Sequence, residues 1–218
     1  EKDLSHVPKG SLVLLNMHAA GWNTGGGVRN ISNAGRLEKA LEGYRVHVFC
    51  GHTHFFQNIV VNENLYQHNI GAACGAWWTG RLNLCGAPNG YLIVDVNGDE
   101  LAWHYKPTGL SANHQLAVYG RGEFPSQHDC VVANVWDYDP ACRVEWFQDG
   151  KAMGAMERFT GVDEGYDSLY GKRKSKTETP HLFRCRPQGR YNEVKVVFTN
   201  RFGERYSAAI RPVTEAQA

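Results

Sequence analysis

Two short apolar runs, each closely followed by histidine, most constrain how this chain can fold. Residues 11–16 form the first run and lead to His18, and residues 44–50 form the second and lead to His52 and His54. Runs of this length and composition are typical of strands, and the first suggests a strand that is covered on both faces. The sequence therefore predicts two strands with histidines just past their carboxyl ends.

A helix is expected between these two strands. Ser32 or Asn33 can cap it, apolar side chains within residues 37–41 fall on one side, and Gly43 can end it. A strand, a helix and a strand in this order predict a right-handed parallel crossover. The two strand ends then open on the same edge of one sheet, which is where open α/β sheets bind ligands.

After residue 58 the pattern changes to strands. The clearest are residues 91–96 and 101–106, which Asn97-Gly98 can join as a hairpin. Turn residues and weak periodicity between residues 107 and 125 indicate a domain boundary. Past that boundary we expect only strands, at residues 131–136, 143–147, 182–185, 193–199 and 206–210.

These patterns predict two units, for which 218 residues are enough. Residues 1–109 read as an α/β unit. Residues 125–218 read as an all-β sandwich of the immunoglobulin or fibronectin type.

The spacing of His52 and His54 suits a shared metal site. Alternate residues of an extended segment point to the same side, and Gly51 allows a sharp turn off the strand. Imidazole nitrogen is a good ligand for Zn, Fe, Mn or Ni, and His18 arrives from the neighbouring strand end. Three imidazoles at one edge thus predict a metal site. Because the chain has ten histidines, unrelated hydrogen-bonded histidines remain the alternative.

Residues 16–18, followed by a helix, a strand and Gly51-His52-Thr53-His54, resemble the last two motifs of the calcineurin-like metallophosphoesterase superfamily. The resemblance extends across residues 1–109, and the all-β part is similar to a sandwich that follows the catalytic domain in some members. For the fold, the resemblance implies part of an α/β unit, a partial metallophosphoesterase β-sandwich with helices. For the activity, it implies hydrolysis of phosphate mono- or diesters by a hydroxide that two divalent metal ions activate. By this resemblance, His18 and His52 ligate one ion and His54 the other.

The family's earlier motifs, Asp-x-His, Gly-Asp and Gly-Asn-His, do not precede His18. Gly98-Asp99 and Asn113-His114 come later in the chain, and we interpret them as structural. We therefore expect the chain to be a C-terminal portion that lacks the N-terminal metal-binding motifs, with the missing part of the catalytic domain as its partner. We assign no catalytic residue within it and expect little or no activity from the chain alone.

Trp77 and Trp78 follow the histidine motif and are candidates for the wall of a substrate pocket, since aromatic rings stack well on a base or sugar. Packing in the core is the alternative. We interpret His47 as a hydrogen-bonded packing residue. Cys74 and Cys85 could pair across a turn or remain free thiols.

The net charge of +1 gives no global field to hold nucleic acid or an anionic membrane. No apolar run approaches the ~20 residues of a membrane span. The basic run at residues 172–176 reads as a solvated loop, so no nucleic-acid partner is expected. Resemblance to bacterial members that carry an added sandwich suggests a periplasmic or secreted protein.

Two other functions remain open at this point. The first is a non-catalytic binding or adhesion module with an incidental histidine metal site. The second is a hydrolase with one metal ion held by three histidines, complete as it stands. Against the second, no carboxylate is placed to act as its general base.

Overall fold

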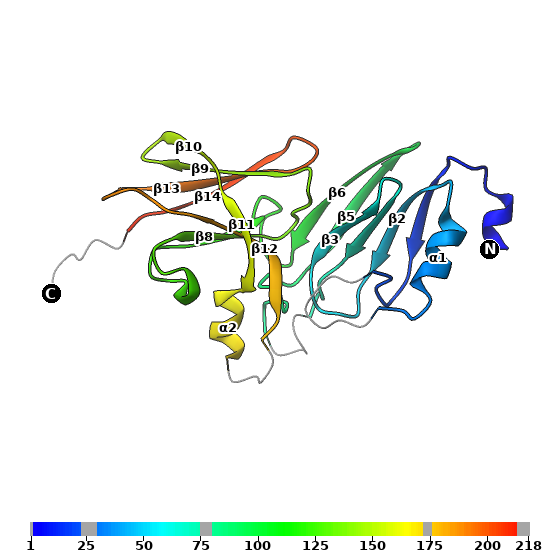
Figure 1. Cartoon of the computed structure of the whole chain (residues 1–218), viewed down its shortest axis with the longest axis horizontal. Coiled ribbons are helices and arrows are strands. Elements are labelled where there is room, and N and C mark those ends of the chain that lie inside the picture. Colours follow the sequence, from blue (N-terminus) through cyan, green and yellow to red (C-terminus); the bar gives the residue numbers. More distant parts are fainter. Residues whose placement is uncertain (1, 23–29, 75–79, 172–175, 213–218) are drawn as a thin grey trace.

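The computed structural model describes residues 2–22, 30–74, 80–171 and 176–212, which form mostly strands and few helices (Figure 1). After a short 3-10 helix, η1 (Asp3–His6), the first sheet has the strand order β1-β2-β4-β3. Its strands are β1 (Leu12–Asn16), β2 (Arg45–Cys50), β3 (Gln57–Asn62) and β4 (Leu65–Asn69).

The predicted parallel crossover is confirmed. β1 pairs with β2 in parallel, from Leu12 opposite Arg45 to Asn16 opposite Phe49. Helix α1 (Ala34–Leu41) connects the two strands, and its Leu41 packs with Val46 and Val48 of β2. Both strands therefore end at the same edge of the sheet.

Strand β1 is not covered on both faces, so that expectation was wrong for the described part of the chain. None of its residues is fully buried, and the side chain of Leu14 is exposed. β1 pairs only with β2, which makes it an edge strand among the described residues. In this sheet the strand whose described residues are all buried is instead β4, which pairs with β2 in parallel and with β3 in antiparallel fashion.

Strand β4 is buried although most of its residues are polar. Gln67, His68 and Asn69 have no exposed surface. Buried polar groups need hydrogen-bond partners, and Gln67 Oε1 accepts from the backbone N–H groups of Gly21 and Trp22 at 2.7 and 3.1 Å. The side chains of this strand therefore tie its neighbours together through polar contacts.

The β5–β6 hairpin forms a separate two-stranded sheet from β5 (Gly90–Asn97) and β6 (Glu100–Pro107). Asn97 pairs with Glu100, so the turn residues are Gly98 and Asp99, one position later than predicted. Gly98 has a φ of 59°. This left-handed value explains why the turn centres on glycine.

The remaining strands form two four-stranded sheets that share a core. One sheet has the order β11-β12-β8-β7 and the other β10-β9-β13-β14. Side chains such as Val131 and Val135 of the first sheet pack with Trp146 and Val196 of the second. The strands are β7 (Leu116–Tyr119), β8 (Val131–Val135), β9 (Arg143–Gln148), β10 (Lys151–Ala155), β11 (Glu157–Val162), β12 (Glu178–Cys185), β13 (Val194–Thr199) and β14 (Arg205–Ile210).

The expectation of strands alone beyond residue 125 was wrong, because helix α2 (Glu164–Tyr170) and a short 3-10 helix, η3 (Pro125–Gln127), lie there. Asp163 caps α2, since its Oδ1 accepts from the N–H of Tyr166 at 2.8 Å. The helix has seven residues, too few for a helical apolar stripe to stand out in the sequence.

A further core cluster joins the first sheet to the rest of the molecule. Phe55 and Phe56, which follow the histidine motif, pack with Tyr105 of β6 and with Trp136, which follows β8. None of the six cysteines, all of which lie in the described part of the chain, is in a disulfide. No helix among the described residues is long and apolar enough to cross a membrane.

Candidate functional site

His18 and His52 meet at the edge where β1 and β2 end. The parallel pairing continues past both strands, because the N–H of Gly51 donates to the carbonyl of His18 at 3.0 Å. His18 Nε2 lies 3.0 Å from His52 Nδ1, with the rings edge to face. Both side chains are exposed. The sequence-based expectation that the two strand ends bring these histidines together is thus met by the structure.

His54 shares a pocket with this pair. The pocket has a volume of about 820 Å³. Its lining comes from the ends of β1, β2 and β4 and from the motif, namely Asn16, Met17, His18, Phe49, Cys50, Gly51, His52, His54, Ile70, Gly71 and Ala72. No Asp or Glu is among these residues. Within residues 2–22, 30–74, 80–171 and 176–212, no three His, Cys, Asp or Glu side chains converge closely enough to hold one metal ion.

The motif is not an extended segment, so the geometric reason given for its spacing was wrong. His52 and His54 have φ values of 71° and 52°. Such left-handed conformations are uncommon for residues other than glycine, and they cluster at functional sites. The backbone therefore turns at each histidine, and the two side chains are placed by this turn rather than by strand alternation.

Contacts from the following segments hold the motif in place. The N–H of Leu84 donates to the carbonyl of His54 at 2.9 Å. Phe55 and Phe56 are completely buried, and the N–H of Phe56 donates to Cys85 Sγ at 3.2 Å. The residues after the motif are thus anchored in a core, while the histidines face the pocket.

A second histidine pair lies between β2 and β4, where His68 is completely buried and His47 is partly buried. His47 Nδ1 lies 2.9 Å from His68 Nε2, and His68 Nδ1 lies 2.9 Å from Asn58 Oδ1. Asn58 Nδ2 donates to Asp137 Oδ1 at 2.7 Å. The prediction that His47 is a hydrogen-bonded packing residue agrees with this arrangement, whereas His68, Asn58 and Asp137 were missed because no local pattern links them.

Burial controls the charges in this hydrogen-bond chain. It lowers the pKa of His47 to about 4, with smaller contributions from the positive charges of Arg201 and Arg45. It also lowers the pKa of His68 well below the ordinary value. Burial raises the pKa of Asp137 to about 7, against the opposing effect of hydrogen bonds from Asn58 and others. Both histidines are therefore neutral near pH 7.

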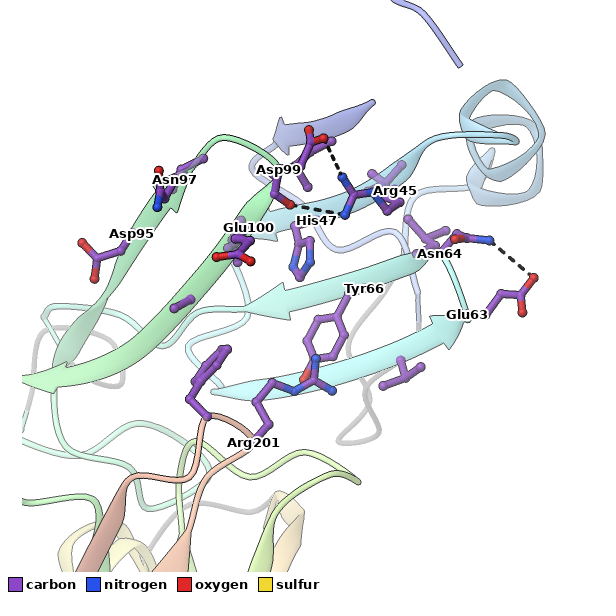
Figure 2. Close-up of a pocket in the computed structure, with 18 of the residues that line it drawn as sticks. Arg45, His47, Glu63, Asn64, Tyr66, Asp95, Asn97, Asp99, Glu100 and Arg201 are labelled. Atoms are coloured by element: carbon purple, nitrogen blue, oxygen red, sulfur yellow. Dashed lines mark hydrogen bonds and ion pairs between the residues drawn. The ribbon is translucent and has the colours of Figure 1, made fainter. Parts of the chain in front are cut away.

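A separate pocket of about 740 Å³ lies at the amino ends of β2 and β4 (Figure 2). His47 and Tyr66 face it from the first sheet, the β5–β6 hairpin borders it, and Arg201 reaches in from the turn between β13 and β14. Arg45 pairs with Asp99 across its rim, 3.3 Å apart. This pocket is at the opposite end of the strands from His52 and contains none of the predicted ligands.

Trp77 and Trp78, predicted to line a substrate pocket, lie outside the described residues. The basic run at residues 172–176 is largely outside them as well, although Lys176 forms an ion pair with Asp167 at 2.7 Å.

Residues 67–206 match the family described as the C terminal of calcineurin-like phosphoesterase, MetallophosC. This match covers well over half of the chain. It begins within β4, so His18, His52 and His54 all precede it. Comparisons with curated proteins and with solved structures gave no match.

Proposed function

Because this chain belongs to the calcineurin-like phosphoesterases, whose C-terminal family matches residues 67–206, we propose that it carries part of a two-metal phosphoesterase site. His18 and His52 hold one divalent ion, and His54 holds the second. The observation that carries this proposal is the 3.0 Å approach of His18 Nε2 and His52 Nδ1 at two parallel strand ends. The ions are Zn, Fe, Mn or Ni, and the substrate is a phosphate mono- or diester.

The two imidazoles fit a shared ion. Bonds of about 2.0–2.1 Å at a tetrahedral angle separate two ligand nitrogens by roughly 3.3 Å. His18 and His52 need to part by only a few tenths of an ångström from their present contact, and both rings are exposed and free to do so. Metal ions at such a site lower the pKa of water and polarise phosphoryl oxygens. The histidines would contribute nitrogen donor atoms to the two ions.

The remaining ligands come from a segment outside this sequence. Two ions need more donors than three imidazoles, and no carboxylate lines the pocket among the described residues. Strand β1 is an edge strand in the described part of the chain, and its Leu14 is exposed. This supports a sheet in which a strand of the missing segment pairs with β1. We therefore infer that the chain is the C-terminal portion of the enzyme and has little or no activity by itself.

The domain organisation follows the same proposal. Residues 1–109 are the C-terminal portion of the catalytic α/β unit, and residues 125–218 are an immunoglobulin- or fibronectin-like sandwich, to which β7 (Leu116–Tyr119) adds a strand. Trp77 and Trp78 contribute to substrate binding. The protein is periplasmic or secreted.

Two measurements test the proposed function. Metal analysis of the purified chain should find a bound divalent ion that is reduced in His52→Ala and His54→Ala. Absence of metal, or metal unchanged in both variants, would rule out the site. Aryl phosphate mono- and diesters should be hydrolysed weakly or not at all by the chain alone. Rapid metal-dependent turnover would contradict the inference that ligands are missing.

A further inference from the structure

We propose that Asn69 and Thr53 are positioning residues that hold His52 and His54 in the geometry needed for metal binding. This inference rests on the proposed function. Asn69 is the last residue of β4 and has no exposed surface. Its side chain reaches the motif from the neighbouring strand, and its amide nitrogen donates hydrogen bonds there.

The amide of Asn69 brackets His54. Asn69 Nδ2 donates to Thr53 Oγ1 at 2.7 Å and to the carbonyl of Phe55 at 2.6 Å. Thr53 lies between the two histidines, is 8% exposed, and donates its own hydroxyl proton to Phe55 O at 3.4 Å. Both amide protons of Asn69 are therefore used, one on each side of His54.

Asn69 also contacts the residue before the motif. The thiol of Cys50 points at Asn69 Oδ1, with 3.6 Å between the two atoms. One buried side chain thus connects the strand that enters the motif to the residue that leaves it. The motif cannot move as a unit without breaking these contacts.

The backbone of the motif explains why such a connection is needed. His52 and His54 both have positive φ, a conformation that side chains with a Cβ rarely adopt. Strained residues persist only where the surrounding structure over-determines them. Without the bonds from Asn69, the backbone can relax toward ordinary φ values, and the two imidazoles then turn away from their present directions.

The test uses Ni²⁺ titrated calorimetrically into the full chain, with His52→Ala defining which part of the binding depends on the motif. Asn69→Asp keeps the shape of the side chain but replaces the donor nitrogen with an oxygen, which can no longer donate to Thr53 Oγ1 and Phe55 O. Thr53→Val keeps the shape of threonine without the hydroxyl, and Thr53→Ser keeps the hydroxyl. We expect Asn69→Asp and Thr53→Val to weaken the His52-dependent affinity about tenfold or more, as loss of ligand-supporting hydrogen bonds typically does, and Thr53→Ser to retain it.

A control separates positioning from general stability. Leu65→Ala lies at the other end of β4 in a different core cluster and lowers stability without touching the motif. It should keep the Ni²⁺ affinity of the unmodified chain. Unchanged affinity in both Asn69→Asp and Thr53→Val, or an equal loss in Leu65→Ala, would overturn the positioning role.

A metal-free measurement distinguishes failure of this inference from failure of the proposed function. If the unmodified chain shows no His52-dependent Ni²⁺ binding, the proposed function fails. Amide hydrogen exchange at residues 52–55 then decides the positioning claim. Faster exchange there in Asn69→Asp and Thr53→Val, but not in Thr53→Ser or Leu65→Ala, supports it, and unchanged exchange contradicts it.

Discussion

Two histidine pairs in this molecule have almost the same separation but different surroundings. His18 and His52 approach to 3.0 Å at the surface, where two strands end. His47 and His68 approach to 2.9 Å between β2 and β4, and His68 is completely buried. The first pair faces a pocket, whereas the second belongs to a chain of internal hydrogen bonds.

Hydrogen-bond directions show what the buried pair can do. Because Asn58 donates its amide to Asp137, its Oδ1 is left to accept from His68 Nδ1. His68 Nε2 must then accept from His47 Nδ1, since both rings are neutral. Three of the four ring nitrogens of His47 and His68 therefore take part in this series of hydrogen bonds. Distance alone therefore does not identify metal ligands, and the partners of each nitrogen do.

The largest expected effect comes from removing the carboxylate that ends the buried chain. Asp137 accepts from Asn58, from Trp103 Nε1 at 3.3 Å and from the N–H of Tyr105 at 3.2 Å. Asp137→Ala removes an acceptor from three buried donors, of which Asn58 Nδ2 also donates to the carbonyl of Tyr138 at 3.4 Å. The substitution should lower the free energy of unfolding by about 3–5 kcal/mol. Urea unfolding measures this. Asp129→Ala, at an exposed position, is the control. If Asp137→Ala lowers the free energy of unfolding by less than about 1 kcal/mol, the buried hydrogen bonds to Asp137 contribute little to stability.

A smaller effect is expected from pH. Folding holds the pKa of His47 at about 4, below the 6.5 of the unfolded chain, so its contribution to stability is present above pH 6.5 and is lost as pH falls toward 4. Asp137 acts in the opposite direction, because its raised pKa of about 7 makes the folded state gain stability as pH falls below 7.

His47→Phe isolates the histidine contribution. Since His47 is only partly buried, solvent screening limits the effect. Between pH 6.5 and 4, we expect the free energy of unfolding of the unmodified chain to fall by about 1–2 kcal/mol more than that of the variant. Unfolding curves at several pH values measure the difference. Parallel pH profiles for the two proteins would contradict the assignment of His47 as a neutral, partly buried partner of His68.

The smallest effect concerns the exposed pair. His52 has a φ of 71°, a conformation that glycine adopts without a steric cost. His52→Gly should raise the free energy of unfolding by about 0.5–1 kcal/mol, and His52→Ala, which keeps the Cβ, should not. Thermal unfolding of both variants checks this. A loss of stability in His52→Gly would mean that the histidine side chain supports the fold rather than a ligand.

The sequence was sufficient to predict the elements whose patterns are local. Residues 11–16 and 44–50 are apolar runs, and Asn97-Gly98 is a strong turn signal, so the crossover and the β5–β6 hairpin could be expected. The burial of strand β4 could not, because Gln67, His68 and Asn69 are polar and their buried hydrogen-bond partners lie elsewhere in the sequence.

The position of the histidines in the candidate site was also predictable, since it follows from strand order. Their local conformation was not. The left-handed backbone at His52 and His54 is imposed by contacts with Asn69 and Leu84, which lie 15 or more residues further along the chain. A sequence pattern around the motif carries no trace of those contacts.

Ni²⁺ titration of His18→Ala, His52→Ala and His47→Phe beside the unmodified chain tests the central claim most directly. Our account predicts that the first two variants lose the binding, because they remove the exposed donor atoms, and that His47→Phe keeps it. Binding that persists in His52→Ala, or that disappears in His47→Phe, would contradict the assignment of the metal site to the edge where β1 and β2 end.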